Sequence, residues 1–147
     1  MTMAQPHACP LCEGDGGQLI VRRPAWRVVR VVGPEAAAFP GFYRVIWNTH
    51  VAEFTDLADA EQSQCLRAVA AVERVVREHL RPDKVNLASL GNVVPHLHWH
   101  VVARYTHDSH FPAPVWAAAQ RPADAQALAA LQARLPACDA AIAHLLR

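Results

Sequence analysis

The sequence predicts an α+β fold with a mainly antiparallel sheet, one long helix and a C-terminal helical segment. Three observations support this class. Short segments rich in β-branched and aromatic residues alternate with Gly- and Pro-containing turns, and one stretch of about twenty residues has the apolar periodicity of a helix. The final part of the chain is rich in Ala and Leu. The order of strands, helix and further strands favours an antiparallel sheet over βαβ units.

Five segments have the composition of strands, and they would form a five-stranded sheet. Gly33-Pro34 ends the second segment and Pro40-Gly41 precedes the third. The five predicted strands cover residues 18–22, 26–32, 42–47, 84–90 and 95–105.

The long helix is expected to start at Asp59, with Asp59 as N-cap and Gln62 completing a capping box. Apolar residues then recur three or four positions apart up to Leu80, which gives the helix one buried stripe. Arg81-Pro82-Asp83 ends it. From residue 123 the chain is expected to be helical again, with an interruption at Pro136.

Length and composition indicate one domain over residues 1–147 and exclude several classes of protein. Hydrophobic residues make up 52% and charged residues 18%, which argues against disorder. The net charge of +1 gives no basic face for a nucleic-acid polymer. No apolar run is long enough to span a membrane, and the first residues do not resemble a secretory signal. A cytoplasmic location is therefore expected.

The most informative segment contains three histidines at alternate positions, His96, His98 and His100. On a strand all three would share one face, while the intervening apolar residues face the core. Three imidazoles in a row are a poor way to build a core, because each ring nitrogen needs a partner or water. A solvated strand face is the plain alternative to a functional site.

Residues His96 to Val102 resemble the signature of the histidine-triad (HIT) family, His-φ-His-φ-His-φ-φ with φ apolar. The surroundings are similar as well: a Cys-x-x-Cys at Cys9 and Cys12, His50 before the long helix, Gly91 ahead of the triad and Trp116 after it. The resemblance covers about residues 9–116, which leaves 123–147 as a C-terminal helical extension.

The resemblance implies a homodimer with a HIT-like fold that hydrolyses or transfers nucleotides at the α-phosphate. His98 would be the nucleophile and would form a covalent nucleotidyl-histidine intermediate. A backbone carbonyl near His100 would accept from His98 and fix its tautomer. His96 would serve as a polar support or as a metal ligand.

Phosphate transfer also needs hydrogen-bond donors around the non-bridging oxygens. By resemblance, Gly91 and Asn92 occupy the position of such donors, although Val93 lacks the hydroxyl found in relatives. Asn86 lies near an Asn that binds phosphate or ribose in relatives, and the loop from Arg104 to Trp116 is expected to approach the phosphate or the partner subunit. Ordinary turn chemistry, or a surface loop, is the alternative for each.

A second implication concerns metal. Cys9, Cys12, His50 and His96 match the positions of a Cys2His2 structural zinc site in some HIT proteins. Four protein ligands leave no open coordination position for catalysis. No organic cofactor is implied.

One departure from the family bears on nucleoside recognition. Many relatives carry in their second strand an Asp that holds the ribose hydroxyls, whereas here Val28 to Val32 contains none.

The leading function is therefore a nucleotide hydrolase whose leaving group is a nucleotide, an amine or a sugar phosphate. The substrates implied are dinucleoside polyphosphates or nucleoside phosphoramidates. The alternatives are a nucleotide-binding or scaffolding protein with little turnover and, more weakly, a metal enzyme with the three triad histidines as ligands.

Overall fold

The computed structural model describes residues 8–147, so the first seven residues of the expected domain lie outside it. Five strands form one antiparallel sheet in the order β1-β2-β3-β5-β4, which confirms the predicted fold class. The strands are β1 (Gln18–Arg22), β2 (Trp26–Arg30), β3 (Phe42–Trp47), β4 (Lys84–Ala88) and β5 (His98–Arg104).

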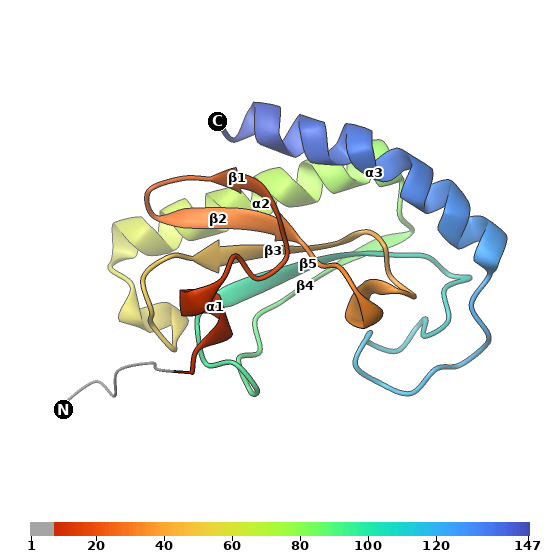
Figure 1. The fold of residues 1–147 in the computed structure, drawn as a ribbon, viewed down its shortest axis with the longest axis horizontal. Coiled ribbons are helices and arrows are strands. Elements are labelled where there is room, and N and C mark those ends of the chain that lie inside the picture. The colour runs from red at the N-terminus through yellow and green to blue at the C-terminus, as the bar shows by residue number, and fades with distance from the viewer. Residues whose placement is uncertain (1–7) are drawn as a thin grey trace.

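Both long helices lie on one face of the sheet, while a short N-terminal helix and several loops lie on the other (Figure 1). The helices are α1 (Pro10–Glu13), α2 (Asp59–Leu80) and α3 (Ala125–Leu145), with short 3-10 turns at Pro34–Ala36 and Phe54–Asp56. Helix α1 was not among the elements predicted from the sequence. None of the helices within residues 8–147 has the length and apolar character needed to cross a membrane.

Helix α2 starts at Asp59 as predicted, but the predicted N-cap was wrong by one residue. Ala58 is the N-cap, and its backbone N–H donates to the carboxylate of Glu61 at 2.9 Å, so neither Asp59 nor Gln62 has the predicted capping role. The helix end agrees with the prediction, because Leu80 is its last residue and Arg81 adopts a left-handed conformation with φ of 47°.

Pro136 does not interrupt α3, contrary to the prediction. A proline inside a helix removes one backbone hydrogen bond. Here the segments before and after it both have buried residues, among them Leu131 and Leu135 on one side and Cys138 and Ile142 on the other. Burial on both sides of the proline holds the helix direction despite the missing bond.

The hydrophobic core lies between the sheet and the two long helices. Val28, Tyr43, Val45 and Val101 are fully buried on the helix-covered face of the sheet. Because side chains alternate along a strand, their neighbours in sequence face the opposite side, where α1 and the loops lie. This second face carries the candidate site.

The predicted fifth strand began at residue 95, but β5 begins at His98. Before it the chain bonds to other segments: the His96 N–H donates to the carbonyl of Val94 at 2.8 Å, and the Leu97 N–H donates to the carbonyl of Val51 at 2.8 Å. His96 therefore lies outside the strand alternation, and the expectation that all three histidines share one strand face was wrong for this residue.

Candidate functional site

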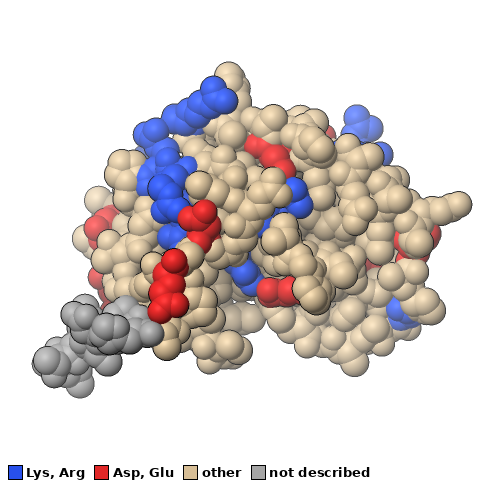
Figure 2. Space-filling view, in the orientation of Figure 1, with Lys and Arg blue, Asp and Glu red and all other residues tan. Residues whose placement is uncertain are grey.

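A pocket of about 550 Å³ opens on the loop-covered face of the sheet, above β3 and β5. His98 and His100 form part of its wall, and Figure 2 shows cationic and anionic atoms close together beside a hollow on this side of the molecule. The pocket is lined by Pro10, Leu11, Gly16, Glu35, Arg44, Leu90, Gly91, Asn92, Val93, Val94, His98, His100 and Trp116.

His98 is buried and has one ring nitrogen engaged. Its Nδ1 lies 2.5 Å from the carbonyl oxygen of His96. A carbonyl can only accept a hydrogen bond, so Nδ1 carries the proton and Nε2 keeps its lone pair. The predicted type of partner, a backbone carbonyl, is present, but it belongs to His96 rather than to the neighbourhood of His100.

Burial lowers the pKa of His98, the hydrogen bond to His96 opposes this shift, and the positive charge of Arg44 adds to it. The imidazole is therefore neutral near pH 7, which is the form that attacks phosphorus.

His100 lies beside His98, with their ring centroids 4.9 Å apart. Burial, together with His98 and Arg44, lowers the pKa of His100 to about 3, so this ring is neutral as well. Its Nδ1 is buried without a hydrogen-bond partner. The rings of Phe42 and Trp116 pack against it at 5.4 and 5.0 Å.

The structure brings together the four predicted metal ligands, Cys9, Cys12, His50 and His96, which we call the metal cluster. Their ligand atoms all lie within 4.8 Å of one another. The Nδ1 of His96 is 3.5 Å from each of the two sulfurs and 3.2 Å from the Nδ1 of His50, which in turn is 3.3 Å from the Sγ of Cys12.

These separations fit a tetrahedral zinc ion. Bonds of about 2.3 Å to sulfur and about 2.0 Å to nitrogen place S and N ligands roughly 3.5 Å apart and two N ligands roughly 3.3 Å apart. Burial lowers the pKa of His96, which favours the neutral imidazole that a metal requires. The metal cluster thus supports a structural zinc, and of the three triad histidines it includes only His96.

Two further contacts orient the metal cluster. The Nε2 of His96 donates to the carbonyl oxygen of Trp47 at 2.6 Å, which turns Nδ1 toward the cysteines. Arg27, only 3% exposed, holds the loop that carries the cysteines. Its guanidinium donates to the backbone carbonyls of Leu11, Gly14 and Asp15 at 2.7, 3.1 and 2.9 Å.

The predicted phosphate-binding residues divide into two groups. Gly91, Asn92 and Trp116 line the pocket, and Gly91 has a φ of 72° that suits glycine. Asn86 does not line it. Instead its Oδ1 accepts from Arg104 at 2.8 Å, so the structure gives this side chain a different contact from the predicted one.

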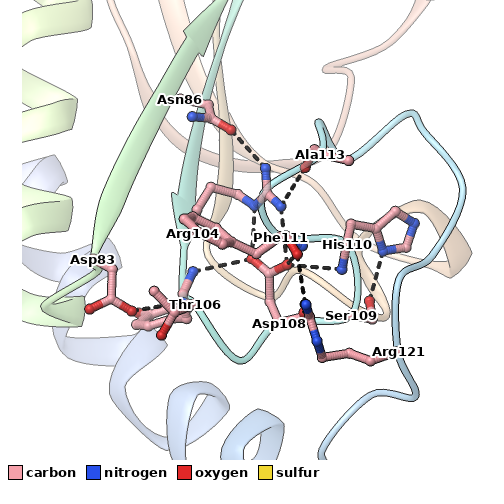
Figure 3. Close-up of polar contacts among 11 residues, drawn as sticks. Asp83, Asn86, Arg104, Thr106, Asp108, Ser109, His110, Phe111, Ala113 and Arg121 are labelled. Atoms are coloured by element: carbon pink, nitrogen blue, oxygen red, sulfur yellow. Dashed lines mark hydrogen bonds and ion pairs between the residues drawn. The ribbon is translucent and has the colours of Figure 1, made fainter.

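The basic group of Arg104 is also turned away from the pocket. Its guanidinium forms a buried ion pair with Asp108, with hydrogen bonds of 2.8 and 3.0 Å, and donates to the carbonyl of Ala113 (Figure 3). Asp108 additionally accepts from the backbone N–H groups of Tyr105, His110 and Phe111. This network fixes the loop that carries Trp116. Asp108 and the two histidines of the loop, His107 and His110, do not line the pocket.

Sequence reasoning missed three residues of the site, Arg27, Glu35 and Arg44. The strand alternation places Arg27 and Arg44 on the histidine face of the sheet, since Arg44 is the cross-strand partner of His100. That register was the available signal, but it requires knowing that β3 and β5 are neighbours.

The fold and the site together define a class. A five-stranded antiparallel sheet that presents His98 toward a pocket, with the Nδ1 of His98 donating to a backbone carbonyl, is the arrangement expected of a histidine-triad protein.

The chain belongs to the HIT domain family, whose model matches residues 19–107. A histidine triad protein from Bradyrhizobium japonicum is 29% identical, with a TM-score of 0.64 and coverage of 82% of this chain and 91% of that one. A Zn-bound histidine triad family protein from Mycobacterium smegmatis is 26% identical, with a TM-score of 0.57 and coverage of 91% and 97%. No significant match is found among curated proteins.

Proposed function

We propose that the protein cleaves nucleotides at the α-phosphate through a covalent intermediate on His98. One observation carries this proposal: His98 is neutral and buried, its Nδ1 donates to a backbone carbonyl, and its unprotonated Nε2 is free at the pocket. The substrates proposed are dinucleoside polyphosphates and nucleoside phosphoramidates.

The reaction has two displacements at phosphorus. In the first, the Nε2 lone pair of His98 forms the N–P bond, and the bond from phosphorus to the leaving group breaks with its electrons passing to that group. The resulting imidazolium keeps its Nδ1 proton on the His96 carbonyl. In the second, water attacks phosphorus, the electron pair of the N–P bond returns to Nε2 of His98, the attacking water gives one proton to bulk water, and the nucleoside monophosphate leaves.

Other groups of the pocket would stabilise the negative charge on the phosphate oxygens or hold the pocket wall in place. Asn92 and Gly91 line the pocket, and the side-chain amide of Asn92 and the backbone N–H of Gly91 would donate to the non-bridging oxygens. The metal cluster contributes four ligands from the protein, so a bound zinc supplies a structural cross-link and holds the wall formed by Pro10 and Leu11.

A nucleotide-binding protein with little turnover is the second candidate. The observation in its favour is that the segment from Val28 to Val32, where many relatives carry the Asp that holds the ribose hydroxyls, contains no carboxylate. We also propose a homodimer, which light scattering on the purified protein would test.

The test is release of nucleoside monophosphate from diadenosine polyphosphates and from an adenosine phosphoramidate. We expect release by the parent and a fall of at least about a thousandfold in His98→Ala. His107→Ala is the matched control, because His107 is exposed and outside the pocket. Alkaline quenching and mass spectrometry should detect the nucleotidyl adduct on a peptide containing His98.

Two results would count against the hydrolase. Retained turnover in His98→Ala would remove the proposed nucleophile. If the parent binds adenosine 5′-monophosphate but releases nothing from any substrate, the binding-protein candidate is favoured.

A further inference from the structure

The pocket contains an ion pair that the proposed mechanism does not use. Arg44 on β3 and Glu35 in the 3-10 turn Pro34–Ala36 both line it, and the Nη2 of Arg44 donates to the Oε1 of Glu35 at 2.7 Å. The Nη1 of Arg44 donates to the carbonyl oxygen of Gly16 at 3.2 Å.

Among residues 8–147, these two side chains are the only permanently charged groups that line the pocket. Arg44 is therefore the cation that a phosphate entering the pocket meets among these lining residues. Glu35 opposes such an anion, because its carboxylate has the same sign of charge and holds the guanidinium.

The guanidinium of Arg44 is incompletely used. Its Nε is buried and has no hydrogen-bond partner within residues 8–147, while the neighbouring Nη2 is the group bonded to Glu35. Nε and Nη2 point the same way and form the fork that binds the two oxygens of a carboxylate or phosphate. A buried donor without an acceptor is unfavourable, so an anion that engages the whole fork is preferred over the present single contact.

The side chains of Arg44 and Glu35 differ in how freely they can move. The side chain of Arg44 is 16% exposed and lies on a strand, whereas that of Glu35 is 48% exposed and lies on a short turn. Glu35 is therefore the partner that can swing away, and Arg44 is the one that stays in place.

Arg44 is directly opposite His100 in the sheet, and His98 is opposite the next inward-facing residue of β3, Ile46. Arg44 is thus the diagonal neighbour of His98, a relation that long side chains bridge. Because Arg44 and His98 line the same pocket, one substrate molecule could place its reacting phosphorus at His98 and a second acidic group at Arg44.

We propose that Arg44 selects substrates with a second acidic group, a phosphate or carboxylate, and that Glu35 occupies the place of this group until the substrate displaces it. This inference rests on the proposed function and narrows it. Polyphosphates are favoured over phosphoramidates of uncharged amines.

The test is equilibrium binding by calorimetry to zinc-loaded protein in a His98→Ala background, which prevents turnover. The probes are inorganic pyrophosphate against phosphate, and adenosine 5′-diphosphate against the 5′-monophosphate. We expect each two-phosphate probe to bind at least about tenfold more tightly than its one-phosphate counterpart, which corresponds to about 1.4 kcal/mol.

Three variants separate the roles of the pair. Arg44→Met should abolish the preference for two phosphates and change one-phosphate binding less than about threefold. Arg44→Lys, which keeps the charge without the fork, should fall between. Glu35→Gln should tighten pyrophosphate binding several-fold. Arg77→Met, which removes an exposed Arg–Glu pair on α2, should change nothing.

Several outcomes would overturn the inference: equal binding of one and two phosphates by the parent, no effect of Arg44→Met on the preference, or weaker pyrophosphate binding in Glu35→Gln. If Arg44→Met does not fold, the Glu35→Gln and Arg44→Lys results decide the matter.

The inorganic and nucleotide arms distinguish this inference from the proposed function. If pyrophosphate is preferred over phosphate in a way that depends on Arg44, but neither adenosine nucleotide binds, the anion-binding role of Arg44 is supported and the nucleotide function is contradicted. Equal, Arg44-independent binding of both adenosine nucleotides leaves the nucleotide function intact and overturns the role of Arg44.

Discussion

The two ends of strand β5 are held in place by different chemistry. Near its start, His96 joins the metal cluster, which attaches the N-terminal loop to the sheet. At its end, Arg104 forms a buried ion pair with Asp108, which fixes the loop that carries Trp116 (Figure 3). Both loops line the pocket, so each end of the strand positions one wall around the same two histidines.

The difference lies in how each arrangement depends on its surroundings. The metal cluster would be completed by an ion from solution, so its contribution would vary with metal supply. The Arg104–Asp108 pair depends only on the chain, and its two side chains are 2% and 7% exposed. One wall is therefore open to external control and the other is not.

Removing one partner of the buried pair tests the second arrangement and has the largest expected effect. Arg104→Met leaves the Asp108 carboxylate buried without its counter-ion, which should lower the free energy of unfolding by about 3–5 kcal/mol. Urea denaturation measures this. Arg77→Met, which breaks the exposed pair with Glu73, is the control and should lower it by about 0–1 kcal/mol. If the free energy of unfolding fell equally in the two variants, burial would not make the Arg104–Asp108 pair more stabilising than a surface pair.

Removing metal tests the first arrangement. We expect about one zinc per chain by elemental analysis and none in Cys12→Ser. With free zinc at a hundred times its dissociation constant, binding stabilises the fold by about 2.7 kcal/mol, and a chelator should remove this. Thermal unfolding with and without chelator measures the shift. Cys65→Ser is the matched control for metal content, because Cys65 lies outside the metal cluster. Unchanged unfolding after complete metal loss would contradict a structural role.

The smallest expected effect is the loss of the stability contributed by Asp108 at acid pH. Burial alone would raise the pKa of Asp108, but hydrogen bonds from Arg104 and three backbone amides outweigh it, and the net pKa is below the ordinary 3.8. A lowered carboxyl pKa gives stability that is complete above the unfolded value and is lost as the pH falls through the folded value.

The stability difference between the parent and Asp108→Asn should therefore be flat from about pH 8 to pH 5. It should shrink only below about pH 3.8, as urea unfolding at a series of pH values would show. A difference that already declines near pH 6 would mean that another group controls it.

The two ends of β5 also differ in what the sequence predicted. The metal cluster was predictable, because cysteine and histidine are the usual zinc ligands and their positions matched a known ligand set. Arg104 and Asp108 were not, because neither residue type reveals whether it lies in solvent or in a buried pair. The strands and α2 were predicted within a few residues, since hydrophobic periodicity determines them locally.

Errors arose where long-range contacts decided the local structure. His96 was placed on the strand by alternation, but bonds to Trp47 and the cysteine loop hold it outside. Pro136 was expected to interrupt α3, but packing on both sides prevents this. The roles of Arg44 and Glu35 became visible only with the strand order and the turn after β2.

The hydrogen bond from His98 to the His96 carbonyl has one more consequence. In enzymes where a carboxylate orients the catalytic histidine, one substitution removes the orienting group and a proton can neutralise it. A backbone carbonyl belongs to every residue and does not ionise between acid and alkaline pH. The orientation of the His98 ring is thus protected from both point mutation and pH, and inherited variation at position 96 affects it only by moving the main chain.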